Sequence, residues 1–495
     1  MPNIAGLELA ALERARLSRD ARFDGRFFIA IRTTGIYCRP ICPSRTAQAR
    51  NVRYFASAAA AEVAGFRPCL RCRPEAAPGT AAWLGTAAVV RRGLGLIEAG
   101  ALDEGSVADL AARLGIGPRH LLRLFVRHVG ASPLALALTR RLHFAACLLA
   151  DTELPVTQVA LASGFGSTRR FNDAFARTYR RPPRELRRLQ RRGAPAAAVA
   201  TAGELVLRLS YRAPYDFTQL LEFLAARAVP GVERVADGSY RRTVACGRAH
   251  ALIKVTALPR ASALALSVHG APPAALLQIA STARRVFDLA ADPARIGREL
   301  AHDELVGPLV RARPGLRIPG AWEPFECAVR AILGQQVSVA AARTFAARLV
   351  QRAGRPLADA SEGLTHLFPS PAAVAAADLG DLGLTRSRVA TLHALARAVL
   401  ERRVDFSAAP QELGAALAAL PGIGPWTAQY VLLRALGEPD ALPSADLVLR
   451  RMAAPDERPL SGRQLDERAR RWQPWRGYAV MHLWRAAAAG RGAAA

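Results

Sequence analysis

Hydrophobic positions follow two periods along the chain, and the changes of period divide it into regions. Between about 85 and 190, apolar residues recur three or four positions apart, which is typical of amphipathic helices. From 204 to roughly 290, strand-like runs such as ELVLRLSYR, RRTVACG, HALIKVTAL and ALALSVHG alternate with two helical stretches. The helical period returns from about 291. This pattern predicts a multidomain, mainly helical chain with an antiparallel sheet that carries two helices on one face.

Turn signals arrange the first helical region into two similar helix pairs. GSVADLAARLGIGPRHLLRLFVRHVGASP starts with an N-capping Ser106, breaks at Gly115 to Pro118, and continues as a second helix. LPVTQVALASGFGSTRRFNDAFARTYRRPPREL repeats this arrangement with a break at Gly164 to Ser167. The second helices carry basic residues, among them Arg123, Arg169 and Arg170. Two helix-turn-helix units are the simplest interpretation, and a generic helical bundle is the alternative.

Length and charge restrict the class of protein. A chain of 495 residues exceeds one hydrophobic core, so we expect three or four domains. The net charge of +28 favours nucleic acid as a partner over a merely solvated basic surface. Nearly all of this charge is arginine, because Lys254 is the only lysine. No uninterrupted apolar run approaches membrane-spanning length and the N-terminus lacks a signal-peptide core, so we expect a cytoplasmic protein without a membrane partner.

Four of the seven cysteines lie near the N-terminus in a metal-binding pattern. Cys38 and Cys42 form C-x3-C, and Cys69 and Cys72 form C-x2-C after 26 intervening residues. Such spacing lets two tight turns present four sulfurs to one tetrahedral ion, for which Zn²⁺ is the commonest occupant. A chance cluster of buried cysteines is the alternative. Neighbouring arginines suggest that the site lies against DNA phosphate. These arginines are Arg39, Arg45, Arg67, Arg71 and Arg73.

Residues 20 to 75 resemble the N-terminal domain of the Ada family of alkylation-response regulators. The likeness runs through FxxAIRTTGIYCRPxC and AGFRPCxRC. It implies that Cys38 is a nucleophilic thiolate that takes one methyl group from a methylated DNA phosphate, with the other three cysteines as ligands only. Loss of one thiolate charge would weaken repulsion from DNA, so DNA binding should tighten after repair. No PCHR-type segment is present, so O6-methylguanine repair is not predicted.

The two helix pairs are similar to the DNA-binding domain of AraC-type activators. The second pair carries the pattern A…GFxSxxxFxxxFxxxxGxxPxxxR, with Arg181 where the pattern has glycine. We therefore expect a different turn after the second recognition helix. The resemblance adds transcription activation, and RNA polymerase as a further partner.

The segment LPGIGPWTAQY, residues 420 to 430, is typical of a helix-hairpin-helix. Gly422 and Gly424 let the backbone turn sharply, so that amide groups at the next helix start meet a DNA phosphate, with a monovalent cation as an optional bridge. A glycine cap between ordinary helices is the alternative. The neighbouring segments FECAVRAILGQQVSVAAARTFAARL, DALPSADLVLRRM and RRWQPWRGYAVMHLW decide between them, because residues 204 to 485 resemble the AlkA family of DNA-3-methyladenine glycosylases.

The AlkA resemblance implies a base pocket and a catalytic carboxylate. Trp426 stands where strand-cutting relatives carry a lysine, so we expect hydrolysis of the glycosidic bond without lyase activity. Four aromatic residues align with the family's pocket for a flipped, cationic purine, although each is also compatible with core packing. They are Trp426, Tyr430, Trp484 and Phe223. Asp446, favoured over Asp440, would stabilise positive charge on the sugar. Gln336 replaces an apolar wedge residue.

These expectations combine into one domain plan. It comprises a small zinc-binding α+β domain (1–82), a helical AraC-like double helix-turn-helix domain (83–190), a linker (191–203, RRGAPAAAVATAG), an antiparallel-sheet α+β domain (204–290) and an all-α helix-hairpin-helix glycosylase domain (291–490). We expect a monomer that repairs alkylated double-stranded DNA and activates transcription. The alternative is a transcriptional activator whose glycosylase portion is degenerate and only binds DNA.

Overall fold

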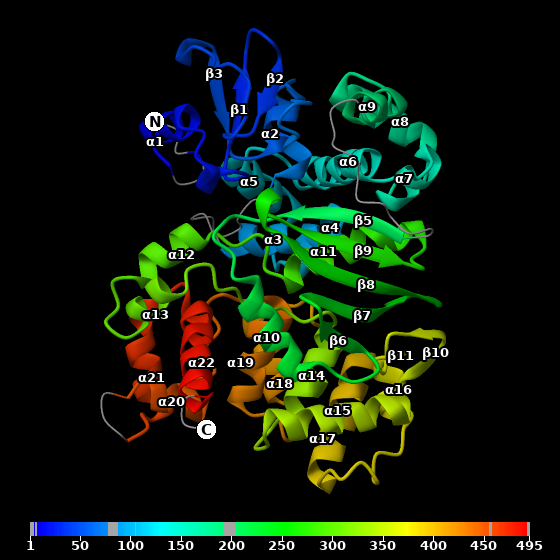
Figure 1. The fold of residues 1–495 in the computed structure, drawn as a ribbon, viewed down its shortest axis with the longest axis vertical. Helices are drawn as coiled ribbons and strands as arrows, with labels where there is room; N and C mark the ends of the chain where they lie inside the picture. The colour runs from blue at the N-terminus through cyan, green and yellow to red at the C-terminus, as the bar shows by residue number, and fades with distance from the viewer. Residues whose placement is uncertain are drawn as a thin grey trace. The chain divides into compact units, whose positions relative to one another are not determined.

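The computed structural model of the chain describes residues 4, 7–77, 88–103, 105–191, 204–454 and 458–492. The chain divides into two compact units. Figure 1 colours the chain by residue number and labels its elements. Unit 1 comprises Met1–Ala213, Cys246–Arg284 and Leu289–Ala291, and unit 2 comprises Pro214–Ala245, Arg285–Asp288 and Asp292–Ala495. Most of the predicted linker lies outside the described residues.

The N-terminal part of unit 1 is a small α+β fold around a four-stranded sheet. The strand order is β3-β1-β2-β4. The bounds are α1 Leu9–Leu17, β1 Phe28–Ile31, β2 Ile36–Cys38, β3 Val52–Phe55, α2 Ala58–Val63 and β4 Arg67–Pro68. β2 and β4 pair in parallel, with Tyr37 opposite Pro68. This pairing brings the strand ends that carry Cys38 and Cys69 side by side.

The helical part of unit 1 contains both predicted helix-turn-helix pairs. Its helices are α3 Ala88–Glu98, α4 Val107–Arg113, α5 Pro118–Val129, α6 Pro133–Asp151, α7 Val156–Ala162, α8 Thr168–Tyr179 and α9 Pro183–Arg191. Ser106 caps α4 in a capping box with Asp109, which satisfies backbone donors at the helix start. Ser167 caps α8. The predicted breaks between α4 and α5 and between α7 and α8 are confirmed.

The turn after α8 departs from the expected one by one residue. Arg180, not Arg181, has the left-handed conformation, with φ of +56°. A glycine would adopt this conformation without strain, so Arg180 occupies the position that the AraC-type pattern gives to glycine. Arg181 instead forms an ion pair with Glu185 at the start of α9.

Helix α6 is the central helix of this part. By length and composition it is long and apolar enough to cross a membrane. Its apolar residues Leu142, Leu148 and Leu149 are fully buried, whereas Thr139 donates a hydrogen bond to Glu62 at 2.6 Å and Arg140 pairs with Asp103. These contacts are those of a core helix in a folded domain.

Residues 204–290 form the predicted sheet region. Five strands lie in the order β5-β9-β8-β7-β6, and β5 and β8 each pair antiparallel with β9. The bounds are β5 Glu204–Ser210, α10 Phe217–Arg227, β6 Glu233–Ala236, β7 Ser239–Cys246, β8 Ala249–Leu258, β9 Ala263–His269 and α11 Leu276–Val286. Side chains alternate along β8, so that Ile253 and Val255 are buried and Lys254 is exposed.

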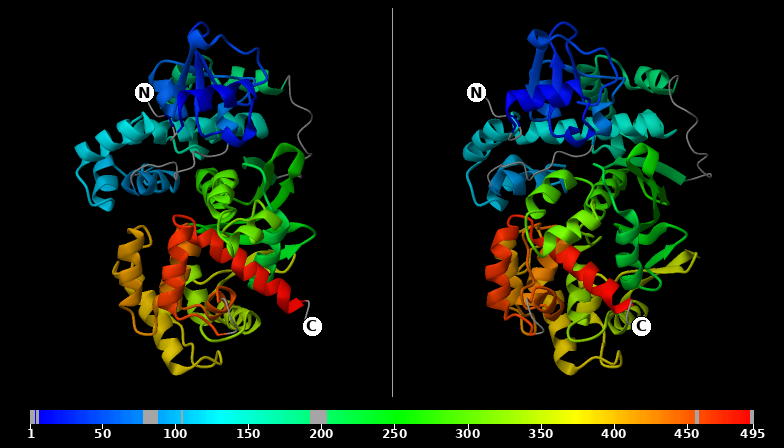
Figure 2. Two further views of the ribbon diagram at one scale, coloured as in Figure 1. Left: turned by 90° about the vertical axis from the view of Figure 1, so that its left-hand side faces the viewer. Right: turned by 60° about the vertical axis from the view of Figure 1, so that its left-hand side comes forward.

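From Asp292 onward, the described part of unit 2 is mainly helical. Its helices are α12 Pro293–Leu300, α13 Val306–Ala312, α14 Pro324–Leu333, α15 Val339–Ala353, α16 Pro371–Ala376, α17 Arg386–Leu400, α18 Pro410–Ala418, α19 Pro425–Val431, α20 Leu447–Met452, α21 Gly462–Arg468 and α22 Arg476–Gly492. Helix α22, the red C-terminal helix in Figure 2, packs against α13 and α20. A π-helical turn, Leu432–Leu436, continues α19.

One segment of this helical region differs from the expectation. β10, Arg355–Ser361, and β11, Leu364–Leu367, form an antiparallel hairpin. The side chains of β10 are almost all exposed. The segment RPLADAS therefore has no buried face to give it a strand-like alternation, which is why the sequence did not predict it.

Candidate functional site

The four N-terminal cysteines come together as the spacing predicts. Their sulfur atoms all lie within 4.8 Å of one another. A tetrahedral Zn²⁺ site with Zn–S bonds of about 2.3 Å needs sulfurs about 3.8 Å apart, so the donor set fits zinc after small adjustments. Cys38, Cys69 and Cys72 are buried, and Cys42 is the most exposed of the four. The protein therefore has one four-cysteine zinc site.

Arg39 holds the cysteine loop in place. Its guanidinium forms an ion pair with Asp24 and donates to the carbonyl oxygen of Cys72 at 3.1 Å. Its backbone N–H donates to Cys72 Sγ at 3.3 Å. Burial lowers the pKa of Arg39, but the hydrogen bond with Asp24 and the nearby negative charges together outweigh burial and leave the pKa above its ordinary value. The side chain is only 12% exposed, so the predicted phosphate contact of Arg39 has to compete with this pairing.

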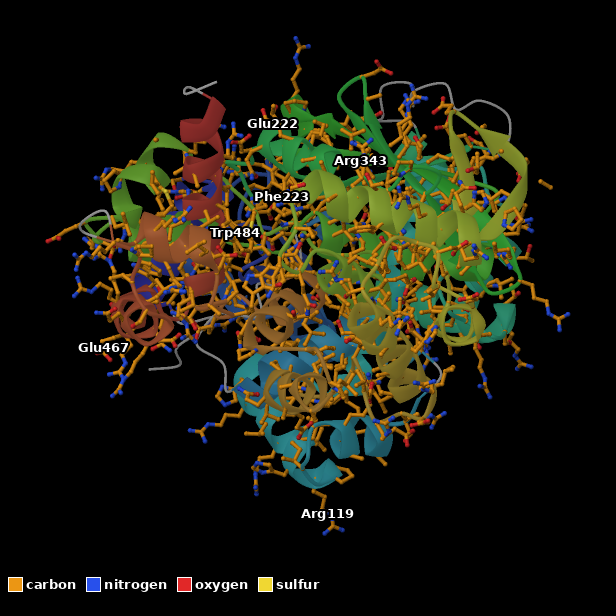
Figure 3. The ribbon with its side chains drawn as sticks, turned by 90° about the horizontal axis from the view of Figure 1, so that it is seen from below. Arg119, Glu222, Phe223, Arg343, Glu467 and Trp484 are labelled. Carbon is orange, nitrogen blue, oxygen red and sulfur yellow. The ribbon has the colours of Figure 1, made fainter. Side chains whose placement is uncertain are left out.

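The other predicted DNA-contacting arginines of unit 1 are more accessible. Arg45 and Arg71 are exposed beside the cysteine cluster, and Arg67 on β4 is half-buried. Arg123 on α5 and both Arg169 and Arg170 at the start of α8 are exposed. Arg119, at the beginning of α5, projects outward in Figure 3. All these contacts with DNA stay predictions.

A polar cluster next to Cys38 was not predicted. The Tyr37 hydroxyl donates to Glu62 at 2.8 Å and lies 3.0 Å from Nε2 of His143 on α6. Thr139 donates to the second oxygen of Glu62. The strand that leads to Cys38 is thus tied to the central helix of the helix-turn-helix part.

The glycine turn lies between α18 and α19, as a helix-hairpin-helix requires. Gly422 has φ of +83°, and a Cβ on it would lie 2.1 Å from Thr391 Oγ1, so conformation and packing both require glycine. Gly424 is different. Its φ is −90°, and no atom lies within 4 Å of its Cβ position. Glycine at 424 thus leaves open space at the start of α19, which accords with the predicted approach of a DNA backbone.

The predicted wedge residue Gln336 is exposed and strained. Its φ is +53°, in the left-handed region that favours glycine. The preceding residue, Gln335, was not predicted. Its Nε2 donates to the carbonyl oxygen of Gly422 at 2.8 Å and to Thr427 Oγ1 at 3.0 Å. Gln335 therefore joins the loop that carries Gln336 to the hairpin.

Asp446 lies among the predicted aromatic residues. Trp426 Nε1 donates to Asp446 Oδ2 at 2.9 Å, and Trp484 Nε1 donates to Oδ1 at 3.3 Å. Asp446 also caps α20, because Oδ1 accepts from the backbone N–H of Leu449 at 3.0 Å. These three donors fix the orientation of a half-buried carboxylate.

Three of the four predicted pocket rings form a continuous group. Trp426 and Tyr430 stack with centroids 5.2 Å apart and planes 17° apart. Tyr430 and Trp484 are 6.1 Å apart at 49°. Asp440, the rejected candidate, makes a two-bond ion pair with Arg476 at 2.8 Å instead. The two aspartates thus differ in their partners, and the catalytic role of Asp446 stays a prediction.

Phe223 lies against two arginines that the sequence did not indicate. The guanidinium carbon of Arg227 is 3.8 Å from the Phe223 ring centroid, and that of Arg434 is 4.6 Å from it. Arg434 also donates to the Tyr430 hydroxyl at 2.7 Å, from within the π-helical turn, a distortion often found at functional sites. Burial lowers the pKa of Arg227. Figure 3 shows the side chain of Phe223 on α10 and that of Trp484 on α22.

A buried ion-pair network supports the α10 side of this site. Arg242 pairs with Glu326 at 2.9 Å, and Arg330 pairs with both Glu326 and Glu233 at 2.8 Å. Burial alone would raise the pKa of Glu233, but Arg330 and Arg242 lower it to about 2. Arg330 also donates to the carbonyl oxygen of Arg227 at the end of α10. The network therefore links α14 to the helix that carries Phe223.

Four family models match the chain in the predicted order. Residues 11–75 match the metal binding domain of Ada, and residues 110–189 match a helix-turn-helix domain. Residues 206–323 match the AlkA N-terminal domain. Residues 329–473 match the HhH-GPD superfamily of base excision DNA repair proteins, a match that includes the hairpin and Asp446.

Curated relatives cover both halves of the chain. A probable bifunctional transcriptional activator/DNA repair enzyme AlkA of Mycobacterium tuberculosis is 43% identical over 95% of each chain. DNA-3-methyladenine glycosylase 2 of Escherichia coli is 40% identical over 56% of this chain and 95% of its own. The bifunctional transcriptional activator/DNA repair enzyme Ada of Escherichia coli is 41% identical over 24% of this chain and 32% of its own.

A solved structure supports the fold of the C-terminal half. The 3-methyladenine DNA-glycosylase from Archaeoglobus fulgidus, at 22% identity, covers 57% of this chain and 98% of its own with a TM-score of 0.51. The mycobacterial relative matches over nearly its whole length in sequence, so this comparison shows the family as well as the fold. The chain belongs to the family of bifunctional transcriptional activator/DNA repair enzymes that join an Ada-type metal-binding and helix-turn-helix half to an AlkA-type glycosylase half.

Proposed function

We propose that residues 204–490 form a monofunctional DNA glycosylase that hydrolyses the N-glycosidic bond of 3-methyladenine and related alkylated purines. The observation that carries this proposal is the Asp446 carboxylate, which accepts hydrogen bonds from the indole N–H groups of Trp426 and Trp484. A single fixed negative charge thus lies beside electron-rich rings. This arrangement suits a cationic base and a sugar that becomes positive as the bond breaks.

Named side chains can assist both base binding and bond cleavage in this reaction. A purine alkylated at N3 or N7 is cationic, so ring faces such as those of Trp426 and Tyr430 attract it after it flips out of the duplex. As the bond between the base nitrogen and C1′ breaks, its electrons leave with the base and positive charge grows on the sugar. Asp446 stabilises that charge and orients the water that attacks C1′.

The same residues account for the absence of lyase chemistry. Strand cleavage by this superfamily starts with a lysine amine that attacks C1′. Trp426 holds that position here, and an indole has no nucleophilic amine. The chain's single lysine, Lys254, is on β8 of the sheet. We therefore expect the product to be an unbroken strand with an abasic site.

The cysteine cluster performs a separate, single-use reaction in this proposal. Zinc, when bound, keeps its ligand thiolates reactive at neutral pH. Cys38 Sγ attacks the methyl carbon of a DNA methylphosphotriester, the C–O bond breaks, and the phosphate regains its negative charge. The thioether carries no charge, so repulsion between the cluster and DNA falls. Because Cys38 is only 5% exposed, DNA binding has to open a path to its sulfur.

We further propose the domain division 1–82, 83–190, 204–290 and 291–490. Tighter DNA binding after methyl transfer would let α5 and α8 enter the major groove and activate transcription, with RNA polymerase as the protein partner. The hairpin at Gly422 and Gly424 would bind phosphate, with an optional monovalent cation. The arginine-rich protein would act as a cytoplasmic monomer on double-stranded DNA.

One assay tests the glycosylase proposal directly. Purified protein is incubated with methylated duplex DNA, and the released 3-methyladenine is measured for the wild type and for Asp446→Asn. We expect release by the wild type and almost none by the variant. Equal release by both would refute the role of Asp446, and no release by a folded wild type would favour the degenerate-glycosylase alternative.

A further inference from the structure

The second helix of the first helix-turn-helix pair exposes two aliphatic side chains. Leu122 is 45% exposed and Val126 is 52% exposed, although Leu121, Phe125 and Val129 of the same helix are buried in the core. Leu122 and Val126 are four residues apart, so they lie on one face of α5. Burial of both side chains against a partner would be favourable, because it would remove apolar surface from water.

Basic side chains lie on the same face as these two residues. Arg119, Arg123 and Arg127 are exposed and recur at every fourth position, beside Leu122 and Val126. Arg119 points away from the ribbon in Figure 3. The sequence of α5, PRHLLRLFVRHV, contains no acidic residue. This face therefore attracts a polyanion, and DNA is the polyanion that the second helix of a helix-turn-helix binds.

The chemistry of the major groove gives the two kinds of side chain different partners. Guanidinium groups donate to phosphate oxygens or to O6 and N7 of guanine. Aliphatic side chains have no donor or acceptor, so among the base edges they match the C5-methyl group of thymine. Leu122 and Val126 are about 6 Å apart along the helix axis, which is close to the rise of about two base pairs. The thymines that they contact should therefore lie close together.

We propose that Leu122 and Val126 contact the C5-methyl groups of thymines and so select the DNA sequence that α5 binds. This inference rests on the proposal that α5 enters the major groove. The other recognition helix differs, because the exposed face of α8 carries Asn172, Asp173 and Arg177. The amide of Asn172 suits adenine, and the carboxylate of Asp173 suits cytosine. The two parts of the binding site should therefore differ in sequence, with thymine required where α5 binds.

Selection of a binding site, followed by removal of single methyl groups, tests this inference. The full-length zinc-loaded protein, before and after exposure to methylphosphotriester DNA, selects duplexes from a random-sequence pool, and sequencing identifies the selected site. Each thymine of that site is then replaced by 2′-deoxyuridine, which lacks only the C5-methyl group. We expect one or two of these replacements to weaken wild-type binding about two- to tenfold, and the others to have no effect.

Protein variants connect the lost methyl group to a particular side chain. Leu122→Ala should weaken binding to the thymine site by a similar factor, and it should bind thymine and uracil equally well at the position that Leu122 contacts. Leu122→Met keeps an apolar side chain and should retain the preference for thymine. The control Leu400→Ala removes the same atoms from a leucine that is 52% exposed at the end of α17, and it should bind DNA as the wild type does.

Different results overturn the two proposals. Thymine recognition is wrong if no thymine methyl group affects binding to the selected site, or if Leu122→Ala discriminates against uracil as strongly as the wild type does. Groove binding by α5 is unaffected by either result. If Leu122→Ala also binds the selected site as tightly as the wild type, a protein is the better candidate to cover this face. If the wild type selects no sequence, the proposal that α5 enters the major groove fails, and thymine recognition fails with it.

Discussion

The cysteine cluster of unit 1 and the Asp446 cluster of unit 2 are built in opposite ways. All four sulfurs come from residues 38 to 72, at the ends of short strands and in the turns that follow them. The carboxylate of Asp446 precedes α20, and the rings grouped around it come from α19 and α22, so this cluster spans residues 426 to 484. The first site depends on local turns, and the second depends on how distant helices pack.

The chemistry proposed for the cysteine cluster also differs from that proposed for Asp446. Cys38 is consumed, because its sulfur forms a bond that the protein does not break again. Asp446 keeps its atoms and acts through its charge, so it can serve many turnovers. A local motif is enough to supply a nucleophile. A site that acts repeatedly through its charge needs a fold that keeps the carboxylate and the aromatic rings in fixed positions.

The largest expected effect is the complete loss of methyl transfer in Cys38→Ser, with excision by unit 2 retained. A hydroxyl at this position is neither a good zinc ligand nor a thiolate nucleophile. Mass spectrometry of peptides after exposure to methylphosphotriester DNA should find the methyl group on Cys38 of the wild type. Methylation of the more exposed Cys42 instead would show that accessibility, not the family position, selects the acceptor.

The converse variant, Asp446→Asn, should lower the rate of 3-methyladenine excision about 10²- to 10⁴-fold, because the amide keeps the shape and removes the charge. Methyl transfer to Cys38 should be unaffected. Asp440→Asn is the matched control, since Asp440 pairs with Arg476 and not with the indoles. Single-turnover kinetics on DNA with one lesion measures both variants, and an equal loss in the control would remove the assignment.

Glu326→Gln should destabilise unit 2 by about 3–5 kcal/mol, because Arg242 and Arg330 then lose a buried charged partner. Thermal unfolding followed by calorimetry should show a lower transition temperature for the glycosylase half, which contains this ion-pair network. Excision should fail at a lower temperature than in the wild type, while methyl transfer persists. A variant as stable as the wild type would mean that water replaces the lost partner.

Acid should weaken unit 2 through His482, whose burial lowers its pKa to about 4. Between the ordinary pKa of about 6.5 and pH 4, the unfolded chain binds a proton that the folded unit does not, so stability falls as the pH is lowered. The loss is up to about 3 kcal/mol by pH 4 and is absent above about pH 7. Denaturation of the wild type and His482→Gln at pH 7 and pH 5 checks this, and an equal acid effect in both would assign it to other groups.

We expect the smallest effect for Gln336→Gly. This substitution removes the backbone strain of a glutamine in the left-handed region. Stability should rise by at most about 1 kcal/mol, because glycine tolerates φ of +53° but loses more chain entropy on folding. Excision should nevertheless slow, since nothing then fills the gap left by the flipped base. Denaturant unfolding and excision kinetics on the same sample measure both changes. Faster excision would exclude the wedge role.

The contrast between the two sites also marks what the sequence could predict. Cysteine spacing is a short-range signal that predicts the zinc cluster directly, whereas the LPGIG turn predicts the hairpin only together with the neighbouring segments that resemble the AlkA family. The AlkA resemblance favours Asp446, which precedes a helix, over Asp440 in the connecting loop, and Asp446 lies beside two indoles. Within a single sequence, the resemblance to known families supplied the distant partners Phe223 and Trp484.

Other parts of the site depend on three-dimensional packing and had no local signal. Gln335 differs from Gln336 only in which way its side chain points, and Arg227 and Arg434 looked like two of many basic residues. The Tyr37–Glu62–His143 cluster joins residues over 100 positions apart. Such contacts become visible only when the fold brings the elements together, whereas the helix cap Ser106 has a local signal in the sequence.

The scarcity of lysine bears on what happens after excision. An abasic site exposes a sugar aldehyde, which condenses with primary amines and can trap a protein on its own product. Arginine guanidinium groups stay protonated and are poor partners for this condensation. Lys254 is the only residue of this chain with a side-chain amine. The arginines can therefore bind the damaged strand without becoming covalently attached to it.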